Sequence, residues 1–497
     1  MTRTHQQWQQ LAQEVSAPTG LFIDGVFAPA ATGAEFETVD PATGEVIARV
    51  ARGAAADVDR AVAAARRSFE SGVWSRTSPG HRKAVLLRIA DSIEEQVDRL
   101  AVLESRDGGK LISDTSVYDI PGTAAILRWY AEAIDKVYGE VAPVGPGSLA
   151  VVTREPLGVI AAVVPWNFPL EMAMWKIGPA LATGNSVVLK PAEATPLTAL
   201  CFAELCAANG LPDGVLNVVT GYGAEAGQAL GRHHDVDAVA FTGSTAVGKL
   251  FMGYSAESNL KQVWPECGGK SANIVFDDVA DLDDVAEKAS YGIFACAGQV
   301  CSASSRLLVA RSLHAELVEK IVARARAMRI GDPLDPASEL GPLISVSERD
   351  RVLSVIERAG IDGAALATGG TRPDGLPAAG AYLQPTVLDG VDAGQELFRE
   401  ETFGPVLSVT SFDTEEEAIA LANASRYGLA ASVFTDSIRR AHRVSERLVA
   451  GTVTINAVDA IDVSVPFGGF RQSGFGRDLS LHALEKYTGL KTRWFTS

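Results

Sequence analysis

The sequence contains few cysteines, few histidines and no long apolar segment. Its five cysteines are irregularly spaced, which argues against a disulfide framework and makes a reducing cytoplasm the expected location. The seven histidines show no spacing with cysteine that is typical of a metal site, so we expect no metal. The longest apolar run, residues 157–165, is too short to span a bilayer, and the polar residues 1–13 lack the apolar core of a secretory signal.

Positive charge is also scarce. The 44 lysines and arginines are outnumbered by 61 aspartates and glutamates, which leaves a net charge of −17. This balance argues against nucleic acid and anionic membrane surfaces as partners. The apolar fraction of 47% and the charged fraction of 21% are typical of a soluble globular protein, and 497 residues predict more than one domain.

Strands and helices are predicted to alternate over two long regions. In the first region, helical patterns follow apolar runs at 159–164, 186–189, 215–219 and 238–241. This alternation predicts a parallel sheet with helices on both faces. In the second region, strands are predicted at 272–276, 306–310, 406–412, 429–434 and 451–455. Elsewhere we expect antiparallel strands within 21–50, helices at 57–70, 79–106 and 119–137, a linker at 141–147, and strands at 149–154 and 487–494.

Polar and small residues follow several of the predicted parallel strands. These are Pro-Trp-Asn-Phe-Pro at 165–169, Lys-Pro-Ala-Glu at 190–193 and Thr-Gly-Ser at 242–244. Ligands of such sheets bind at the carboxyl ends of the strands. Gly243 and Ser244 open a helix, whose N–H groups and dipole can hold a phosphate, although this is not the G-x-G-x-x-G pattern. The alternative for each glycine is a tight turn, and for Lys190 a solvated charge.

Cys301 lies among small residues where a helical pattern ends and a strand begins, and such loops often carry catalytic groups. A thiol suits covalent attack on a carbonyl near neutral pH. Taken alone, however, Cys301 favours the simpler interpretation of a buried, small hydrophobic residue.

Seven motifs together resemble the aldehyde dehydrogenase superfamily over nearly the whole chain. They are Pro165–Pro169, Lys190–Glu193, Phe241–Ser244, Glu266–Lys270, Gly298–Cys301, Glu401–Pro405 and Pro466–Gly469, in the order and spacing of the family. The resemblance implies an α/β fold with three parts. These are a Rossmann-like NAD-binding domain (1–139 and 159–266), an α/β catalytic domain (267–456) and a small β oligomerisation element (140–158 and 481–497), while 457–480 returns past the active site. It also implies a homodimer or homotetramer.

The resemblance further implies oxidation of a small-molecule aldehyde to an acid. Cys301 would attack the carbonyl, and the Asn167 amide with the Cys301 backbone N–H would stabilise the thiohemiacetal oxygen. Hydride transfer to a nicotinamide would leave a thioester, which water activated by Glu266 would hydrolyse. Lys176 is placed with these catalytic residues. The alternatives are a turn role for Asn167 and a surface position for Glu266, which Pro265 and Cys267 disfavour.

The family pattern also implies an NAD site, with NADP as the second choice. Lys190 and Glu193 would bind the adenosine ribose, Glu401 the nicotinamide ribose and Ser244 the pyrophosphate, and the Glu193 carboxylate would repel a 2′-phosphate. The full set of implied cofactor residues is Val163, Val164, Pro165, Trp166, Lys190, Glu193, Gly223, Gly227, Phe241, Thr242, Gly243, Ser244, Val247, Glu401 and Phe403.

A narrower resemblance, over 257–261, 476–478 and 480–488, is to γ-glutamyl-γ-aminobutyraldehyde and 4-guanidinobutyraldehyde dehydrogenases of polyamine catabolism. It implies an ω-amino, acylamino or guanidino aldehyde as substrate. Residues expected to contact this substrate are Met172, Trp175 and Phe467 along the aldehyde tunnel and Asp119, Asp459 and Asp462 at a cationic end. For Asp119, capping of the helix that follows is the stronger interpretation.

Departures from these patterns keep alternatives open. Residues 458–462 lack the glycines and the aromatic residue of the relatives. The alternative prediction is therefore an aldehyde dehydrogenase that acts on a broad range of aliphatic or aromatic aldehydes. A CoA-acylating enzyme would not need Glu266, and a catalytically silent binding protein would not need Cys301. Cys267 and Cys296 stand where the family commonly has other residues. We hypothesise that one of them forms a reversible disulfide with Cys301, although small packing residues are the simpler interpretation.

Overall fold

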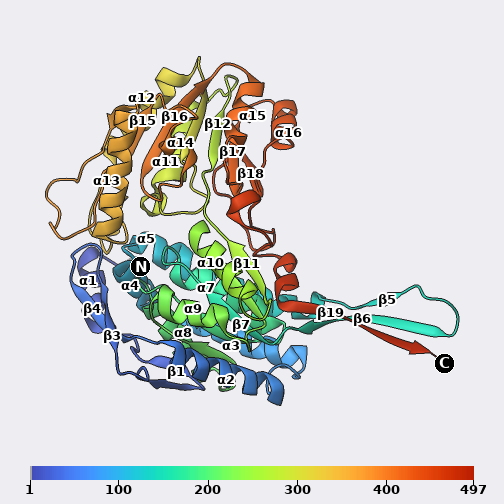
Figure 1. The fold of residues 1–497 in the computed structure, drawn as a ribbon. Helices are drawn as coiled ribbons and strands as arrows, with labels where there is room; N and C mark the ends of the chain where they lie inside the picture. The colour runs from blue at the N-terminus through green and yellow to red at the C-terminus, as the bar shows by residue number, and fades with distance from the viewer. Residues whose placement is uncertain (1–2, 497) are drawn as a thin grey trace.

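The structure is a computed structural model that describes residues 3–496 (Figure 1). Two seven-stranded sheets and one three-stranded sheet form its framework. A short two-stranded ribbon of β3 (Glu35–Val39) and β4 (Val46–Ala51) accompanies them. The two large sheets lie in separate lobes, and the small sheet extends away from both as an arm. In the described part of the chain, no helix combines the length and the apolar character needed to cross a bilayer.

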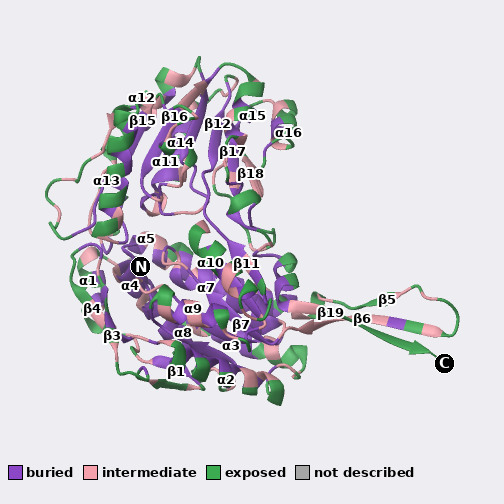
Figure 2. Cartoon of the chain, viewed as in Figure 1, coloured by how far each residue is buried: buried purple, intermediate pink, exposed green. Residues whose placement is uncertain are grey.

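The first large sheet contains the predicted parallel strands. Its order is β11 (Gln262–Glu266), β10 (Ala238–Thr242), β7 (Val159–Val163), β8 (Ser186–Lys190), β9 (Leu216–Val218), β1 (Leu21–Ile23) and β2 (Val26–Ala28). The first five strands are parallel, and β1 and β2 add an antiparallel edge. Every residue of β7, β8 and β10 is buried, which explains their continuously apolar sequence (Figure 2).

Alternate residues of β7 enter two different cores. Ile160 and Ala162 pack into a large core with α3 (Pro79–Glu95), α4 (Val97–Gly108), α6 (Ile120–Ala133), α7 (Pro169–Ala182) and α8 (Leu197–Ala208). Val159, Ala161 and Val163 pack into a smaller core with α2 (Ala55–Ser71), α9 (Gln228–Arg232) and α10 (Thr245–Ala256). The sheet is therefore covered on both faces, as the alternation of strands and helices predicts.

The second large sheet is also mostly parallel. Its order is β14 (Ala365–Thr368), β15 (Thr386–Asp389), β16 (Val406–Phe412), β13 (Arg306–Ala310), β12 (Ala272–Val275), β17 (Ala430–Phe434) and β18 (Thr452–Ile455), with β14 antiparallel. The helices of this lobe are α11 (Leu282–Phe294), α12 (His314–Ala327), α13 (Val346–Ile361), α14 (Glu396–Arg399), α15 (Glu415–Asn423) and α16 (Ile438–Ser445).

The arm consists of β19 (Thr488–Thr496), β6 (Ser148–Pro156) and β5 (Glu140–Ala142), joined antiparallel. β5 begins at the edge of the stretch that the sequence predicts to be a linker, so part of that stretch is a strand. The remaining short elements are α1 (His5–Glu14), α5 (Ile112–Asp114), η1 (Thr115–Asp119), η2 (Ile134–Lys136), η3 (Gly223–Gly227), η4 (Ala295–Gly298), η5 (Arg471–Ser473) and η6 (Leu481–Tyr487).

Two helix predictions need correction. The single helix expected over 79–106 is divided at Gln96, whose non-helical backbone separates α3 from α4. Asp119 does not cap the helix that follows. Its own backbone is helical, it ends the π-helical turn η1, and its side chain makes no capping hydrogen bond. The helical path begins earlier, at Ile112, and Pro121 sits in the first turn of α6, where a missing N–H is tolerated.

Candidate active site

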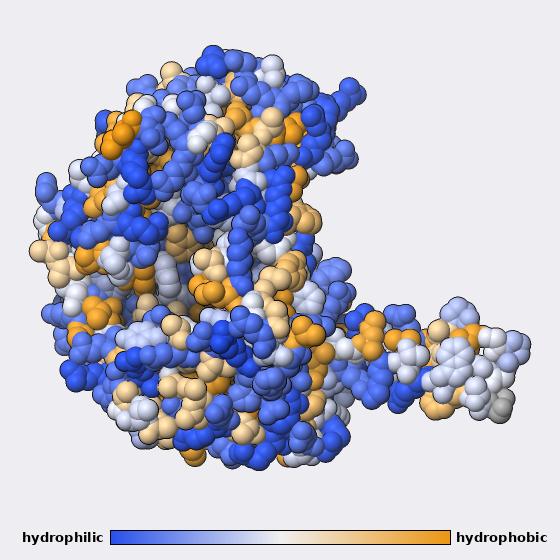
Figure 3. Space-filling model, viewed as in Figure 1, coloured by the Kyte–Doolittle hydropathy of each residue, from blue (hydrophilic) through white to orange (hydrophobic). Residues whose placement is uncertain are grey.

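A cavity of about 430 Å³ lies between the two large lobes, where the surface is hollowed (Figure 3). The first lobe contributes residues from the ends of β7 and β10 and from α7, and the second lobe contributes loops that precede β13 and β16. Predicted site residues that line it are Pro165, Trp166, Asn167, Met172, Trp175, Thr242, Gly243, Ser244, Cys301, Glu401, Phe403, Asp459 and Phe467.

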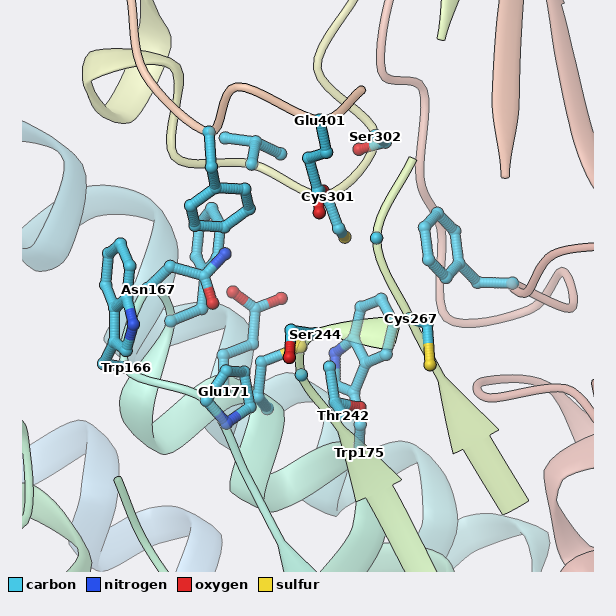
Figure 4. A pocket seen from close by; sticks show the side chains of 18 of the residues that line it. Trp166, Asn167, Glu171, Trp175, Thr242, Ser244, Cys267, Cys301, Ser302 and Glu401 are labelled. Atoms are coloured by element: carbon cyan, nitrogen blue, oxygen red, sulfur yellow. The ribbon is translucent and has the colours of Figure 1, made fainter. Parts of the chain in front are cut away.

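Cys301 reaches the cavity from a tight loop (Figure 4). Three consecutive residues before it, Cys296, Ala297 and Gly298, have positive φ values of 48°, 53° and 70°. A Cβ on Gly298 would stand 2.1 Å from the Gly404 carbonyl oxygen, so only glycine fits there. Burial raises the pKa of the Cys301 thiol well above its usual range, and the carboxylates of Glu266, Asp459 and Glu401 add to this effect. The resting thiol is therefore protonated at neutral pH.

Asn167 holds an amide beside this thiol. It follows β7, is 7% exposed, and its Nδ2 donates one hydrogen bond to the Gln299 carbonyl oxygen at 2.8 Å. The backbone oxygen of Asn167 accepts from Lys110 Nζ at 3.0 Å. These contacts orient the side chain and leave the second Nδ2 hydrogen for a ligand in the cavity.

Glu266 ends β11 directly behind the cavity wall formed by Cys267 and Gly268. It is 4% exposed, and its Oε1 has no hydrogen-bond partner among residues 3–496. Burial raises the pKa of Glu266 to about 8, with a further contribution from Asp478. Glu266 is therefore mostly protonated at pH 7, and its carboxylate form, which grows as the pH approaches 8, is a stronger base than an ordinary glutamate.

Lys176 does not reach the cavity. Its fully buried ammonium forms an ion pair with Asp478, and the same carboxylate pairs with Lys486. Burial opposes the charge of Asp478, but the two ammonium groups hold the pKa of that carboxyl below its usual range. The positive charges of Lys176 and Lys486 lower the pKa of Glu266, the candidate base. Lys176 therefore influences Glu266 electrostatically and does not contact the cavity.

The expected dinucleotide-binding residues lie at the carboxyl ends of β7, β8 and β10. Lys190 Nζ is 2.9 Å from Glu193 Oε2, and both lie outside the cavity. Ser244 caps α10, where its hydroxyl accepts from the Val247 N–H at 3.3 Å. The buried Thr242 hydroxyl lines the cavity and has no hydrogen-bond partner in the described part of the chain.

The nicotinamide end of this region involves the second lobe. Glu401 Oε1 accepts from the Gly269 N–H at 3.1 Å, and burial raises the pKa of Glu401 to about 7. A Cβ on Gly268 would stand 2.0 Å from Glu401 Oε2, so any side chain there would displace the Glu401 carboxylate. The Phe403 ring meets the Trp166 ring edge-on at 5.3 Å. The Glu401 carboxylate, the N-terminus of α10 and the Thr242 hydroxyl are groups of the kind that bind a dinucleotide.

The other implied cofactor residues do not line the cavity. Val163, Val164 and Phe241 are buried, and Gly223 and Gly227 begin and end the π-helical turn η3. The described residues contain no group of three histidine, cysteine, aspartate or glutamate side chains suited to holding a metal ion.

Two of the three aspartates predicted at the substrate end do not line the cavity. Asp119 is 4% exposed and lies 2.8 Å from the buried Lys110 ammonium, which requires a counter-ion. Asp462 is exposed and accepts from the Ser464 hydroxyl at 2.5 Å within its own loop. Asp459 does line the cavity, where the Ser302 hydroxyl donates to it at 2.5 Å. The sequence motifs predict where these segments lie, but they do not predict which residues the aspartate side chains bind.

The sequence analysis did not include Glu171 in the site, although it lines the cavity. A signal was available, because Glu171 is the one charged residue between Leu170 and Trp175 in an apolar helix. Glu348 and Arg351 are further lining residues that no motif indicated.

The cysteines have different surroundings. Cys267 lines the cavity, and its Sγ is 2.8 Å from where a Cβ on Gly248 of α10 would stand. Cys296 lines a separate small cavity with Lys110. Burial raises the pKa of each of these two thiols to about 12. All five cysteines are free, and a disulfide with Cys301 stays a prediction.

Comparison with known proteins identifies the family. The sequence pattern of the aldehyde dehydrogenase family matches residues 27–493. The NADP/NAD-dependent aldehyde dehydrogenase PuuC of Escherichia coli is 53% identical over 489 residues, which are 98% of each chain. The aminoacetaldehyde dehydrogenase of Pseudomonas aeruginosa is 51% identical over 492 residues, which are 99% of this chain and 98% of the relative.

Solved structures agree. A γ-glutamyl-γ-aminobutyraldehyde dehydrogenase from Burkholderia cenocepacia superposes with a TM-score of 0.97 at 52% identity and covers 99% of this chain and 100% of that chain. An indole-3-acetaldehyde dehydrogenase in complex with NAD⁺ superposes with a TM-score of 0.98 at 49% identity and full coverage of both chains. The predicted α/β fold is confirmed, and the chain belongs to the aldehyde dehydrogenase family as an NAD(P)-dependent aldehyde dehydrogenase.

Proposed function

We propose that the protein oxidises aldehydes that carry an amino, acylamino or guanidino group at the far end of the chain, with NAD as the hydride acceptor. The Asp459 carboxylate, held by Ser302 next to Cys301 in the cavity wall, is the observation that supports this substrate class most strongly. The one cationic lining residue, Arg351, is already paired with Glu348 at 2.8 Å. The described lining therefore holds acidic side chains without a basic partner, and its Trp175 and Phe467 rings suit an alkyl chain or a cation.

In the first step, Cys301 must lose its proton before it attacks the aldehyde carbon. Glu266 is the acceptor we assign, because its carboxylate form, populated as the pH approaches its pKa of about 8, is a stronger base than an ordinary glutamate. The thiohemiacetal oxygen would be stabilised by the free Nδ2 hydrogen of Asn167 and by the Cys301 N–H. One such donor is typically worth about 10²–10³ in rate.

In the second half of the reaction, Glu266, having released the Cys301 proton to solvent, would take a proton from water, which attacks the thioester carbon and expels the Cys301 thiolate. Gly268 and Gly269 carry no side chain between Glu266 and the cavity, so the carboxylate can approach the ester. Bound NAD supplies the hydride acceptor that converts the thiohemiacetal into this thioester.

The cofactor would be held by charge and by backbone donors. Glu401 would bind hydroxyl groups of the nicotinamide ribose, and the N-terminus of α10 with Ser244 would bind the pyrophosphate. Lys190 and Glu193 would bind the adenosine ribose. The Glu193 carboxylate would repel a 2′-phosphate, which favours NAD over NADP.

The test is NADH production from a panel of aldehydes, with wild type beside Cys301→Ala and Asp459→Asn. The panel contains 4-guanidinobutyraldehyde, γ-glutamyl-γ-aminobutyraldehyde, 3-aminopropionaldehyde, and neutral aliphatic and aromatic aldehydes. We expect kcat/KM to favour the ω-substituted aldehydes, Cys301→Ala to abolish turnover, and Asp459→Asn to weaken the preference for cations. A preference of wild type for neutral aldehydes would refute the substrate class and retain the chemistry, whereas no turnover at all would favour a silent binding protein.

We also propose that the arm pairs with a second copy of the chain. Leu490, Trp494 and Phe495 of β19 are 66%, 59% and 52% exposed, although β19 is fully paired with β6 on one side. An exposed strand edge with large apolar side chains is a typical interface. Sedimentation velocity should give the mass of a dimer or tetramer, and Trp494→Glu should shift it toward the monomer.

A further inference from the structure

Glu171 is the one acidic residue in the otherwise apolar stretch of α7 between Leu170 and Trp175. Every residue of α7 except Glu171 is buried. Its side chain turns from the start of α7 into the cavity that also receives Cys301 and Asn167 (Figure 4). It forms no ion pair with any residue between 3 and 496, and the Trp175 indole N–H is close enough to lower its pKa slightly. Placing a carboxylate on this helix is costly unless something binds it.

The layer behind Glu171 contains more acids than bases. Glu104 is 1% exposed, and its Oε1 accepts from the Leu170 N–H at 2.8 Å. Asp119 is paired with Lys110, whose ammonium also donates to the Asn167 carbonyl oxygen and lies 3.3 Å from the centre of the Phe168 ring. Lys110 is thus the one base beside Glu171 and the two buried acids Glu104 and Asp119, and it is paired with Asp119.

Protons must compensate for this surplus when the cavity is empty. Burial, together with the negative charge of Asp119, raises the pKa of Glu171 to about 8 and that of Glu104 to about 7. Lys110 opposes these shifts but does not cancel them. At neutral pH Glu171 is therefore mostly the neutral acid, and it becomes an anion when a positive charge arrives.

We propose that Glu171 is the specificity-determining residue that receives the cationic end of the substrate, and that it releases its proton to solvent as the cation binds. This rests on the proposed function. The step is balanced: a carboxylic acid and an ammonium ion become a carboxylate–ammonium pair and one free proton. An acylamino aldehyde would instead meet the neutral acid, which can donate a hydrogen bond to an amide oxygen. One residue thereby accommodates both substrate types.

The test is calorimetric titration of n-butylammonium, an unreactive cation, into full-length wild type with NAD present. Measuring the heat in phosphate and in Tris at pH 7 gives the number of protons released. From the pKa of about 8 we expect about 0.9 proton per bound cation at pH 7 and close to none at pH 9.5. Neutral 1-butanol should release none.

Two isosteric variants make the assignment specific. Glu171→Gln should bind n-butylammonium roughly 10- to 100-fold more weakly and release no proton, because a charge-assisted hydrogen bond is lost. Glu348→Gln is the matched control. It removes a carboxylate from the same cavity, but one already paired with Arg351, so the proton count should equal that of wild type.

The possible results separate this inference from the proposed function. No proton release by wild type, or an unchanged count in Glu171→Gln, would overturn the role of Glu171 even if cationic aldehydes are the preferred substrates. Release that depends on Glu171 would support that role even if turnover proves to favour neutral aldehydes.

Discussion

Replacing Lys486 with methionine should raise the pKa of Glu266, and replacing Asp478 with asparagine should lower it. The two residues are halves of one buried ion pair, and Asp478 has no exposed side-chain surface. Each oxygen of Asp478 meets one ammonium, from Lys176 or from Lys486. Because Glu266 senses the charge of Asp478 and of both lysines, removing one sign or the other must move its pKa in opposite directions.

The expected shift is about one pKa unit in each direction. Coulomb's law with an effective dielectric of about 20 gives roughly 2 kcal/mol for unit charges about 8 Å apart, equivalent to about 1.5 pKa units. Relaxation and entry of water reduce this value. The alkaline rise of thioester hydrolysis, centred near the Glu266 pKa of about 8, should move to about 9 in Lys486→Met and about 7 in Asp478→Asn.

The assay is kcat against pH, combined with the pre-steady-state burst of NADH that reports the acylation half of the reaction. Lys491→Met is the control, because this nearby lysine pairs with Glu155 on the exposed arm and should leave the profile unchanged. Shifts of the same sign in both variants, or no shift, would refute the charge coupling.

Stability gives an independent check on the same pair. Asp478→Asn leaves two buried ammonium groups without a carboxylate and should cost about 3–5 kcal/mol, whereas Lys486→Met leaves the Lys176 pair intact and should cost about 1.5–3 kcal/mol. Burial lowers the pKa of Lys486 to about 8 from the ordinary 10.5. Between these pH values the unfolded chain binds more protons, so the free energy of unfolding should rise with pH in wild type and rise less in Lys486→Met.

Two further predictions concern the cofactor and the corrected aspartate. Glu193→Gln removes the charge that would repel a 2′-phosphate, so the ratio of kcat/KM for NADP to that for NAD should rise roughly tenfold in steady-state assays, and an unchanged ratio would assign selectivity elsewhere. Asp119→Asn should destabilise the protein by about 3–5 kcal/mol in urea unfolding, because Lys110 loses its buried counter-ion, whereas Asp462→Asn in its exposed loop should change stability by less than about 0.5 kcal/mol. Equal effects of these two asparagine variants would contradict the assigned pairing.

The elements predicted from sequence are those whose pattern is local. The apolar runs in strands β7, β8 and β10 do not alternate with polar residues, because helices cover both faces of the sheet. Asn167 and Ser244 follow two of these parallel strands, so one sheet edge brings them together. The break at Gln96 is not predicted from the sequence, because the apolar pattern continues through it without a glycine or proline.

Family motifs located Asn167, Glu266, Cys301 and Glu401 because these residues lie in short segments with strict backbone demands. Gly298 and Gly268 show why those segments are recognisable, since a Cβ at either position would collide with a neighbouring backbone or carboxylate. The motifs could not supply the partners of charged side chains. Asp119 was read as a cap, but the lysine nine residues earlier in the chain turns back to meet it.

The sequence by itself therefore determined the family, the alternation that builds the sheets and the residues expected to carry the chemistry, because each depends on neighbours within a few residues. The tertiary structure decided which carboxylates face the cavity, which are paired and which carry protons. Glu171, Asp119 and Asp478 are alike in sequence as acids on or beside helices, yet one is unpaired, one has one lysine and one has two. Burial and the distance to opposite charge set these differences, and both arise only when distant segments pack together.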